Sequence, residues 1–540
     1  MKIRAVVLLG TLALASSYFT PSSSAREQGP APSVVEEYRV PTEWGTIYGW
    51  VERPAGPDKV PIILTYSPYA ATTSPAPGEE IDFGDGTVSG AFVPRGYARA
   101  LFHLVGTGNS GGCYDYGGLR ERKTGYAVVE FLGEQPWSNG RVGMLGGSYD
   151  GTTQLAAAVE NPPHLVTIIP QVPISRWYDY TYGQGVRFYS GFATPLVFDV
   201  GYNQIPMLTF TPTDPATAEA LVDSVRPCET LYHQQRGFLP DPVYDGFWAE
   251  RDYRIRAENI RASVLLEGSW VDYNVHPINS IEMWKVLPRD IEARLVMGQQ
   301  GHAGANLTDS AQVRLAWFDY WLKGENNDIL KKLPTVTSQL NNQEIVTYEK
   351  WPPRGTRKVK LPLLDDTAPN TLEMANGDSQ EWNDFDPLLS EVDVLAGRAP
   401  STSVLFFGPP LEEPLHIAGS PRLKTWVTSN MESTHLTPVL FDESPDGVRR
   451  VITRGLLNSR NRESINNSLP IPLGVPWGGI VRFQPTDYVL PVGHRLGVAM
   501  MSMNRAEALY PDETRATNEI ELKGRTMLLL TVIAPDTNLW

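Results

Sequence analysis

The feature that most constrains the fold is an alternation of short apolar runs with amphipathic segments between about residues 34 and 324. Seven runs have the length and composition of strands and are bounded by Gly, Pro or polar turns: IYGWV, PIILTYSPY, ARALFHLVG, RVGML, LVTIIPQV, ASVLLEGSW and EARLVMG. Several are apolar on both faces, as expected of parallel strands covered by helices on both sides. The segments KTGYAVVEFLGEQPW, TTQLAAAVEN and AQVRLAWFDYWLKG have helical spacing. This alternation predicts an α/β fold with a mostly parallel sheet.

Two further regions depart from this alternation. Residues 174–261 begin with the aromatic stretch RWYDYTYGQGVRFYSGF and continue with Pro and polar residues, which is typical of an insertion lying over the sheet. After residue 333, short β-type runs are separated by Pro, Gly and Asn turns, which predicts an all-β sandwich or jelly roll. At 540 residues the chain is too long for one ordinary core. We therefore expect an α/β core in residues 26–173 and 262–332, a partly helical cap in 174–261 and a C-terminal β domain in 333–540.

The N-terminus has the pattern of a secretory signal peptide. Lys2 and Arg4 provide a basic start, the run VVLLGTLALA is apolar, and a stretch of small residues ends at Ala25. We therefore expect residues 1–25 to be removed and the mature protein to be secreted, either extracellular or periplasmic. The apolar run is too short for a membrane-spanning helix and no later stretch of the sequence is long enough, so we expect no membrane span.

The charge of the chain bears on its partners. The formal net charge is −15, and Lys and Arg form no run in the sequence. A nucleic-acid surface needs clustered basic residues, so we expect no nucleic-acid partner. The sequence is compatible with a homo-oligomer and does not determine the number of subunits.

The chain contains two cysteines, Cys113 and Cys228. In an oxidising compartment they could form one disulfide, and two separate buried thiols are equally compatible with the sequence. Neither cysteine has His partners at the spacing of a zinc site, and we expect no metal and no cofactor.

A serine lies in a glycine-rich turn between a predicted strand and a predicted helix. The strand is RVGML, the turn is GGSYDG and the helix is TTQLAAAVEN, with Ser148 at the centre of the turn. This arrangement is typical of the nucleophile elbow of α/β hydrolases, in which the sharp turn requires small neighbours such as Gly146. The usual G-x-S-x-G signature is displaced here, because Asp150 occupies the second glycine position and Gly151 follows it. On this pattern alone, a catalytic serine and a structural turn are equally compatible with the sequence.

Further motifs favour the catalytic reading. The turn resembles the G-x-S-Y-x-G elbow of the group that includes X-Pro dipeptidyl-peptidase, cocaine esterase and α-amino-acid ester hydrolase. The chain also has SPY at Ser67–Tyr69, where this group has a Pro-Tyr pair, and GTGNSGG at Gly106–Gly112, which is similar to the group's glycine loop. His103 and Val105 stand where the group usually has an Asp and an Arg, which puts the group's local ion pair in doubt. The resemblance implies an α/β-hydrolase core with an inserted cap and a C-terminal jelly roll.

A nucleophilic serine needs a base that is oriented by a carboxylate, and in this fold the chain order is Ser, then Asp or Glu, then His. Among the eight histidines, His302 follows a late core strand on a Gly-flanked loop. Asp272 follows the penultimate core strand, at the sheet edge where catalytic residues of α/β sheets collect. Its context, Asp-Tyr-Asn-Val, resembles the dipeptidyl-peptidase form more closely than the esterase form. We therefore predict a triad of Ser148, Asp272 and His302.

Other acids and histidines have simpler structural interpretations. Glu267 lies inside the strand that precedes Asp272 and is expected to be a buried, satisfied carboxylate. His276 is expected to position the loop that follows Asp272. Three histidines of the β-rich C-terminal region are expected to be structural: His416, His435 and His494. His164 lies in the turn after the elbow's helix, too close to reach back to Ser148, and His233 does not follow a late core strand.

The predicted triad implies an acyl-enzyme mechanism in which His302 removes the proton of Ser148. The resemblance implies an oxyanion hole formed by the Tyr69 hydroxyl, to which we add the backbone N–H of Tyr149. Members of the group cleave Xaa-Pro dipeptides from peptide N-termini, hydrolyse amino-acid esters or deacylate small amides. The Asp-Tyr-Asn-Val context and the secretory pattern favour the peptidase, with the esterase or acylase as the alternative. A non-catalytic protein whose β domain binds glycan or cell wall is a third hypothesis.

A peptidase of this kind needs an apolar pocket for proline and a carboxylate for the substrate's ammonium group. The cap stretch RWYDYTYGQGVRFY supplies candidates for both. Trp177, Tyr178 and Tyr182 could pack against the substrate, and Asp179 could hold the ammonium. An ordinary role in the cap's own core is at least as compatible with the sequence for each of them.

Overall fold

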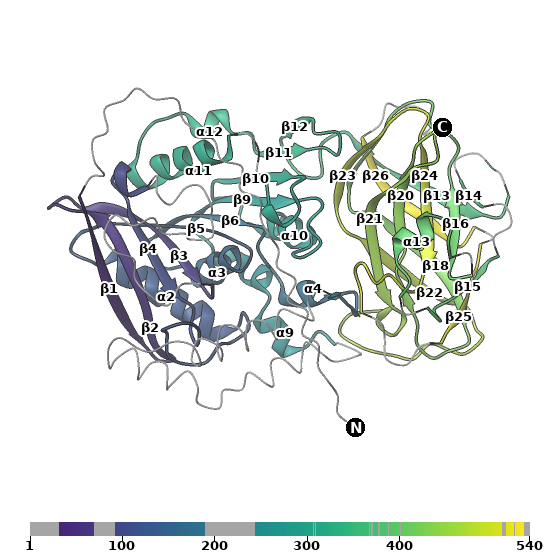
Figure 1. Ribbon diagram of the computed structural model, residues 1–540, viewed down its shortest axis with the longest axis horizontal. Coiled ribbons are helices and arrows are strands. Elements are labelled where there is room, and N and C mark those ends of the chain that lie inside the picture. Colours follow the sequence, from purple (N-terminus) through teal and green to yellow (C-terminus); the bar gives the residue numbers. More distant parts are fainter. Residues whose placement is uncertain are drawn as a thin grey trace.

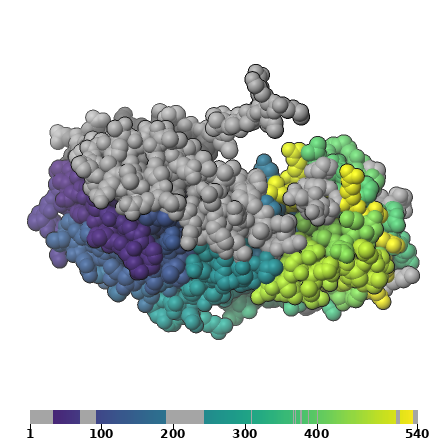
Figure 2. Space-filling view, turned by 90° about the horizontal axis from the view of Figure 1, so that it is seen from below, coloured from purple at the N-terminus to yellow at the C-terminus, as the bar shows by residue number. Residues whose placement is uncertain are grey.

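The structure is a computed structural model, and it describes residues 32–69, 92–189 and 243–533, apart from short gaps at 306, 308, 367, 369–370, 376–378, 387, 400, 510–514 and 523. The expected signal peptide and the middle of the expected cap, which includes His233 and Cys228, lie outside the described residues. The chain forms an α/β core and a β-rich C-terminal domain that lie side by side (Figure 1). In Figure 2 the C-terminal domain, coloured green to yellow, lies next to the teal part of the core.

The core is built on one mixed sheet that has ten strands in the described residues. The sheet is antiparallel at both edges and parallel from β4 to β11, as the strand alternation predicts. In spatial order its strands are β1 (Ser33–Thr42), β2 (Gly45–Pro54), β4 (Ala98–His103), β3 (Val60–Ser67), β5 (Ser138–Gly147), β6 (Leu165–Gln171), β9 (Ser263–Ser269), β10 (Ala293–Gly298), β11 (Val336–Gln339) and β12 (Ile345–Tyr348).

Helices cover both faces of this sheet, which explains why β3, β4 and β9 are buried along their whole length. One face packs against α2 (Leu119–Gly133), α3 (Tyr149–Ala158) and α10 (Ile278–Val286) in the largest apolar cluster. The other face packs against α11 (Ser310–Phe318), its π-helical continuation η5 (Asp319–Lys323) and α12 (Ile329–Lys332). The predicted helix over residues 311–324 is confirmed, and it ends at Gly324 in the left-handed conformation.

The described part of the cap connects β6 to β9. It contains short elements: α4 (Trp177–Thr181), β7 (Tyr182–Gly183), β8 (Val186–Arg187), α9 (Gly246–Glu250) and the 3-10 helix η3 (Tyr253–Asn259). The hairpin formed by β7 and β8 reaches the C-terminal domain, where Asn458 donates its N–H to the Gln184 carbonyl and Leu509 donates to the Arg187 carbonyl. The described cap therefore contacts both domains.

The C-terminal domain is a mostly antiparallel β structure, and the prediction of a β-rich domain is confirmed. Its strands form one path that closes where β18 also pairs with β26. The strands are β13 (Thr356–Leu364), β14 (Leu372–Met374), β15 (Glu381–Asn383), β16 (Ser403–Phe407), β17 (Leu415–Gly419), β18 (Arg422–Ser429), β19 (His435–Leu436), β20 (Val439–Glu443), β21 (Arg449–Asn458), β22 (Trp477–Phe483), β23 (Thr486–Leu490), β24 (Arg495–Met501), β25 (Thr517–Ile520) and β26 (Met527–Ile533). One short helix, α13 (Glu391–Leu395), lies against them.

Two strands that follow residue 332 extend the core sheet. The expected core ends at residue 332, but β11 pairs in parallel with β10, and β12 pairs with β11. Both strands therefore belong to the core sheet, and the first strand of the C-terminal sheet is β13, which starts at Thr356. The Pro and Asn residues around β11 and β12 resemble the turns of the β domain, which is why composition placed them there.

Candidate active site

The predicted elbow forms the connection between β5 and α3. Ser148 has φ 59° and ψ −122°, a conformation that non-glycine residues rarely adopt and that costs on the order of 1–3 kcal/mol. Its neighbours must be small, because a Cβ on Gly146 would lie 2.5 Å from Cβ of Asp150. A Cβ on Gly151 would lie 2.5 Å from the Gln171 carbonyl oxygen of β6. The displaced glycine of this elbow is therefore required by the approach of α3 to the neighbouring strand.

Ser148, His302 and Asp272 lie together at the carboxyl ends of β5, β10 and β9. Nε2 of His302 is 2.8 Å from Oγ of Ser148, and Nδ1 of His302 is 2.9 Å from Oδ2 of Asp272. A carboxylate only accepts hydrogen bonds, so Nδ1 carries the imidazole proton and Nε2 is left to accept the serine proton. The side chains are 154 and 30 residues apart in the chain and form the continuous hydrogen-bonded series that the sequence analysis predicts.

The carboxylate of Asp272 is held by its own loop. The side chain is fully buried, and its Oδ1 accepts the N–H groups of Asn274 and Val275 at 2.8 and 3.0 Å. These bonds leave Oδ2 directed at the imidazole. His302 lies in the short helix η4 (Gly301–Ala303), and its side chain is one-third exposed. The arrangement presents a solvent-accessible base on a buried, fixed carboxylate.

The two predicted oxyanion donors come from different elements. Tyr69 follows β3, its side chain is 39% exposed, and its hydroxyl donates to Oγ of Ser148 across 3.4 Å. Tyr149 is the first residue of α3, so its N–H lies at the positively polarised end of a ten-residue helix. The Tyr69 hydroxyl and the residue that follows Ser148 can therefore supply donors to a substrate carbonyl oxygen, on which negative charge develops during acyl transfer.

A buried acid beneath the elbow was missed in the sequence analysis. Glu121 of α2 accepts hydrogen bonds from the Tyr149 hydroxyl at 2.8 and 2.9 Å and from the Gly117 N–H at 2.7 Å. Burial raises its pKa to about 8. This contact holds the side chain of Tyr149, the residue that follows Ser148. A lone Glu at the start of a helix gives no sequence signal for this, because an exposed N-terminal acid has the same pattern.

The glycine loop that departs from the related group is held by hydrogen bonds. His103 is buried, and its Nδ1 accepts the N–H of Asn109 at 2.9 Å. Val105 donates its N–H to the Tyr66 hydroxyl at 3.0 Å. A Cβ on Gly108 would lie 2.2 Å from the His103 ring, so the imidazole fills the space inside the loop.

The residues expected to be structural have structural contacts where they are described. Glu267 is buried and accepts hydrogen bonds from Arg314 at 3.0 and 2.6 Å and from Gln171 at 2.9 Å. Burial lowers the pKa of His435 to about 4. Four other histidines each lie within 3.0 Å of a carboxylate oxygen. The pairs are His164 with Glu130, His276 with Glu507, His416 with Asp487 and His494 with Asp442.

The cap residues proposed for substrate binding are part of the cap's own core. Trp177 and Tyr178 are fully buried, and the Trp177 ring lies 5.1 Å from the ring of Tyr149, beneath the elbow. Tyr182 is also buried and packs against Tyr178, with ring centroids 5.4 Å apart. These contacts are intramolecular, and they account for the aromatic richness of this stretch.

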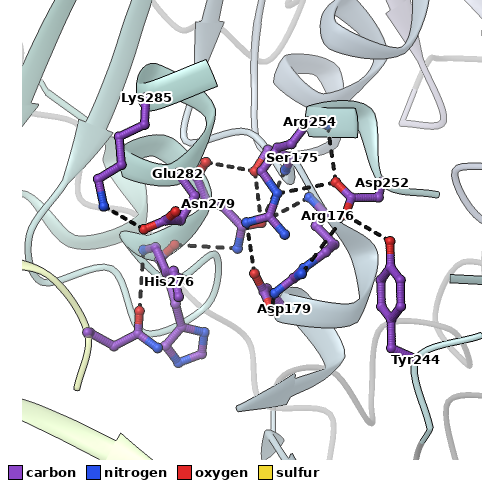
Figure 3. A network of polar contacts seen from close by, with 12 residues as sticks. Ser175, Arg176, Asp179, Tyr244, Asp252, Arg254, His276, Asn279, Glu282 and Lys285 are labelled. Atoms are coloured by element: carbon purple, nitrogen blue, oxygen red, sulfur yellow. Dashed lines mark hydrogen bonds and ion pairs between the residues drawn. The ribbon is translucent and has the colours of Figure 1, made fainter. Parts of the chain in front are cut away.

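Asp179 requires a correction, because its carboxylate is already neutralised. Figure 3 shows it between Arg176 and Arg254; its oxygens accept hydrogen bonds from both, at 2.9 Å in the case of Arg254. Burial acts to raise the pKa of Asp179, but the two guanidinium groups outweigh burial and hold it below its usual value. The carboxylate is therefore not available to hold a substrate ammonium group. The sequence could not reveal this, since Arg254 comes from the far side of the insertion.

Cys113 is disulfide-bonded. The second cysteine of the chain, Cys228, lies outside the described residues. No helix in the described parts of the chain is both long and apolar enough to span a bilayer.

Comparison with protein families gives two matches. Residues 49–304 match the family described as X-Pro dipeptidyl-peptidase (S15 family), and residues 327–531 match the X-Pro dipeptidyl-peptidase C-terminal non-catalytic domain. A putative Xaa-Pro dipeptidyl-peptidase of Bacillus anthracis is 29% identical over 491 residues, which cover 84% of this chain and 79% of that protein. The Xaa-Pro dipeptidyl-peptidase of Lacticaseibacillus casei is 25% identical, over 78% of this chain and 60% of that protein.

Solved structures share the whole fold. A CocE/NonD family hydrolase from Staphylococcus aureus has a TM-score of 0.74 at 18% identity, and the match covers 93% of this chain and 94% of that chain. An α-amino acid ester hydrolase has a TM-score of 0.71 at 18% identity, over 95% of this chain and 98% of that chain. The predicted α/β-hydrolase core with a C-terminal β domain is thus confirmed.

Proposed function

Because the chain belongs to the X-Pro dipeptidyl-peptidase (S15) family of serine hydrolases, we propose that it releases Xaa-Pro dipeptides from peptide N-termini through an acyl-enzyme. The observation that carries this proposal is the series Ser148–His302–Asp272, with contacts of 2.8 and 2.9 Å. A structural turn would not need a base at the serine oxygen or a buried carboxylate behind the base.

The proposed reaction has two acyl-transfer steps. Nε2 of His302 accepts the Ser148 proton while Oγ attacks the carbonyl carbon, and the new imidazolium is stabilised by Asp272. The tetrahedral oxyanion accepts hydrogen bonds from the Tyr69 hydroxyl and the Tyr149 N–H, each worth on the order of 3 kcal/mol in the transition state. His302 then protonates the leaving amine, the C–N bond breaks, and a water activated by the same imidazole hydrolyses the ester.

A second candidate function is the hydrolysis of small esters or amides without ammonium recognition. One observation favours it: Asp179, the acid proposed for the substrate ammonium, is neutralised by Arg176 and Arg254. In the peptidase, another acceptor must then hold the ammonium group.

A matched set of chromogenic substrates separates the two functions. We expect Ala-Pro-p-nitroanilide to be cleaved, and both its N-acetylated form and Ala-Ala-p-nitroanilide to be poor substrates, because a dipeptidyl-peptidase recognises a free amine and a proline. Rapid hydrolysis of p-nitrophenyl butyrate together with no release from Ala-Pro-p-nitroanilide would reject the peptidase and support the esterase. No turnover of any substrate would favour the non-catalytic hypothesis.

We further propose that the protein is exported after removal of its first 25 or so residues. The basic, apolar and small-residue segments at the N-terminus support this, as does the disulfide at Cys113, since disulfides persist in oxidising compartments. The mass of the protein recovered outside the cytoplasm tests it. A mature N-terminus near residue 26 is expected, and a full-length cytoplasmic protein would contradict the proposal.

A further inference from the structure

The loop that carries Asp272 faces the C-terminal domain. It runs from the end of β9 to the start of α10, and at its end the N–H of Ile278 donates to Oε1 of Gln484 in the C-terminal domain at 3.3 Å. Tyr273 and His276, one and four residues after the aspartate, both contact that domain directly. The carboxylate of the triad is thus presented by a segment that lies between two domains.

Tyr273 contacts an arginine of the C-terminal domain. The Arg454 guanidinium of β21 lies 3.9 Å from the centre of the Tyr273 ring, within the range of a cation–π interaction. Tyr273 as a whole is 43% exposed. This contact joins the residue next to Asp272 to a position 181 residues later in the chain.

His276 contacts the same part of the C-terminal domain through an acid. Its Nε2 lies 3.0 Å from Oε2 of Glu507, and its ring stacks on Phe188 of the cap at 3.8 Å. Phe188 in turn forms a β-bridge with Ala508, which follows Glu507. The cap and the C-terminal domain therefore hold the imidazole from two sides; His276 is drawn in Figure 3.

Arg454 is itself held rigidly. Its Nε and Nη2 donate to the two oxygens of Glu391, the first at 2.6 Å, and its Nη1 lies 3.3 Å from Glu507. Glu391 also accepts the side-chain amide N–H of Asn504 at 2.8 Å. A guanidinium with a bidentate partner has little freedom to move, so it can define the position of the ring that it contacts.

We propose that Arg454 and Tyr273 are positioning residues for the catalytic acid, so that the C-terminal domain, described in relatives as non-catalytic, sets the geometry of the triad. Asp272 depends on the N–H groups of Asn274 and Val275 in the same loop, and a shift of the loop moves the carboxylate away from His302. Misplacing a reacting group by 1 Å can cost about 10²-fold in rate. The inference rests on the proposed catalytic role of Asp272.

A pair of variants at Tyr273 tests the contact with the ring. Tyr273→Phe keeps the aromatic face and is expected to retain activity within about threefold, whereas Tyr273→Leu removes it and is expected to lower kcat by about 10²-fold with little change in KM. Arg454→Met removes the cation from the same contact and is expected to lower kcat in the same way. Arg449→Met is its matched control, because Arg449 makes an equivalent contact within the C-terminal domain, 5.0 Å from the Phe407 ring and 2.7 Å from Glu443. It is expected to lower thermal stability and leave kcat unchanged.

A double-mutant cycle shows whether Tyr273 acts through the acid. In the Asp272→Asn background, Tyr273→Leu is expected to have no further effect, since the carboxylate it positions is gone. A full additional loss in that background, or an effect confined to KM, would overturn the proposal and make Tyr273 a substrate contact. The assay uses both the Ala-Pro and the butyrate ester reporters. A wrong substrate assignment then leaves the cycle measurable, and an unchanged kcat in Asp272→Asn alone would instead reject the triad.

Discussion

The elbow at Ser148 and the loop at Asp272 serve the same proposed reaction but are held in different ways. The elbow is fixed by a strand, a turn and a helix that follow one another in the chain, with Gly146 and Gly151 allowing the close approaches. The Asp272 loop is flanked by side chains that contact Phe188, Arg454 and Glu507, which come from the cap and the C-terminal domain. Ser148 is therefore positioned by neighbouring elements, whereas Asp272 is held by its own loop and, in our proposal, that loop is held by distant parts of the chain.

A short sequence motif can predict the first kind of arrangement but not the second. The conformation of Ser148 is dictated by its immediate neighbours, so a short motif predicts it. The orientation of Asp272 also depends on contacts more than 180 residues away, which no local pattern contains.

The largest expected effect is the loss of activity when Asp272 is replaced by Asn. We expect kcat to fall by about 10⁴-fold, because an amide can present its N–H to Nδ1 of His302 and stabilise the wrong tautomer. Steady-state kinetics with the Ala-Pro reporter measure the loss. Glu267→Gln, in the preceding strand, provides the control and should retain most activity if the protein folds. A larger loss of kcat in Glu267→Gln than in Asp272→Asn would show that Asp272 is not the acid of the triad.

Removing the Tyr69 hydroxyl tests the donor that follows β3. Tyr69→Phe deletes the O–H that lies 3.4 Å from Oγ of Ser148, and we expect kcat to fall by about 10²–10³-fold with KM little changed. Tyr189→Phe, an exposed tyrosine of the cap, serves as the control. Unchanged kcat in Tyr69→Phe would remove this hydroxyl from the oxyanion hole.

A substitution at Gly151 tests whether packing of the elbow requires a glycine at this position. A Cβ there would lie 2.5 Å from the Gln171 carbonyl oxygen, so Gly151→Ala should destabilise the fold by about 1–3 kcal/mol. Gly246→Ala is the matched control, because no atom lies within 4 Å of its added Cβ. Urea denaturation of both variants provides the comparison. Equal stability of the two would show that the displaced glycine is not required by packing.

The buried acid beneath the elbow gives a pH-dependent test. Burial raises the pKa of Glu121 from 4.5 to about 8, so the folded state binds its proton more tightly than the unfolded state. Its contribution to stability is therefore complete below pH 4.5 and is lost as the pH rises to about 8. Glu121→Gln should make stability less dependent on pH across this interval, whereas the exposed Glu134→Gln should not. Urea unfolding at pH 5, 7 and 9 measures both; parallel curves for wild type and Glu121→Gln would contradict this prediction.

Much of the fold follows from sequence periodicity. The seven apolar runs of the core are strands of one sheet, because buried parallel strands need long apolar stretches between turns. The strands β11 and β12 were expected in the β domain but pair with the core sheet, since short strands with polar residues have the same composition in either place. The position of a domain boundary depends on pairing partners, which periodicity does not specify.

The site was predictable to a similar degree. Ser148, His302 and Asp272 could be selected by their places after core strands, and the structure brings all three together. Asp179 could not be assigned, because an acid near an aromatic stretch has the same pattern whether it faces a ligand or an arginine. Glu121 and Arg454 gave no signal, since their roles come from partners in other elements.

The most direct measurement of the central claim is the intact mass of the protein after reaction with an Ala-Pro diphenyl phosphonate, which forms a covalent bond with an activated serine. We expect one adduct per chain, located on the peptide that contains Ser148, and no adduct in Ser148→Ala. Labelling of another residue, or equal labelling of wild type and Ser148→Ala, would contradict the assignment of this serine as the nucleophile.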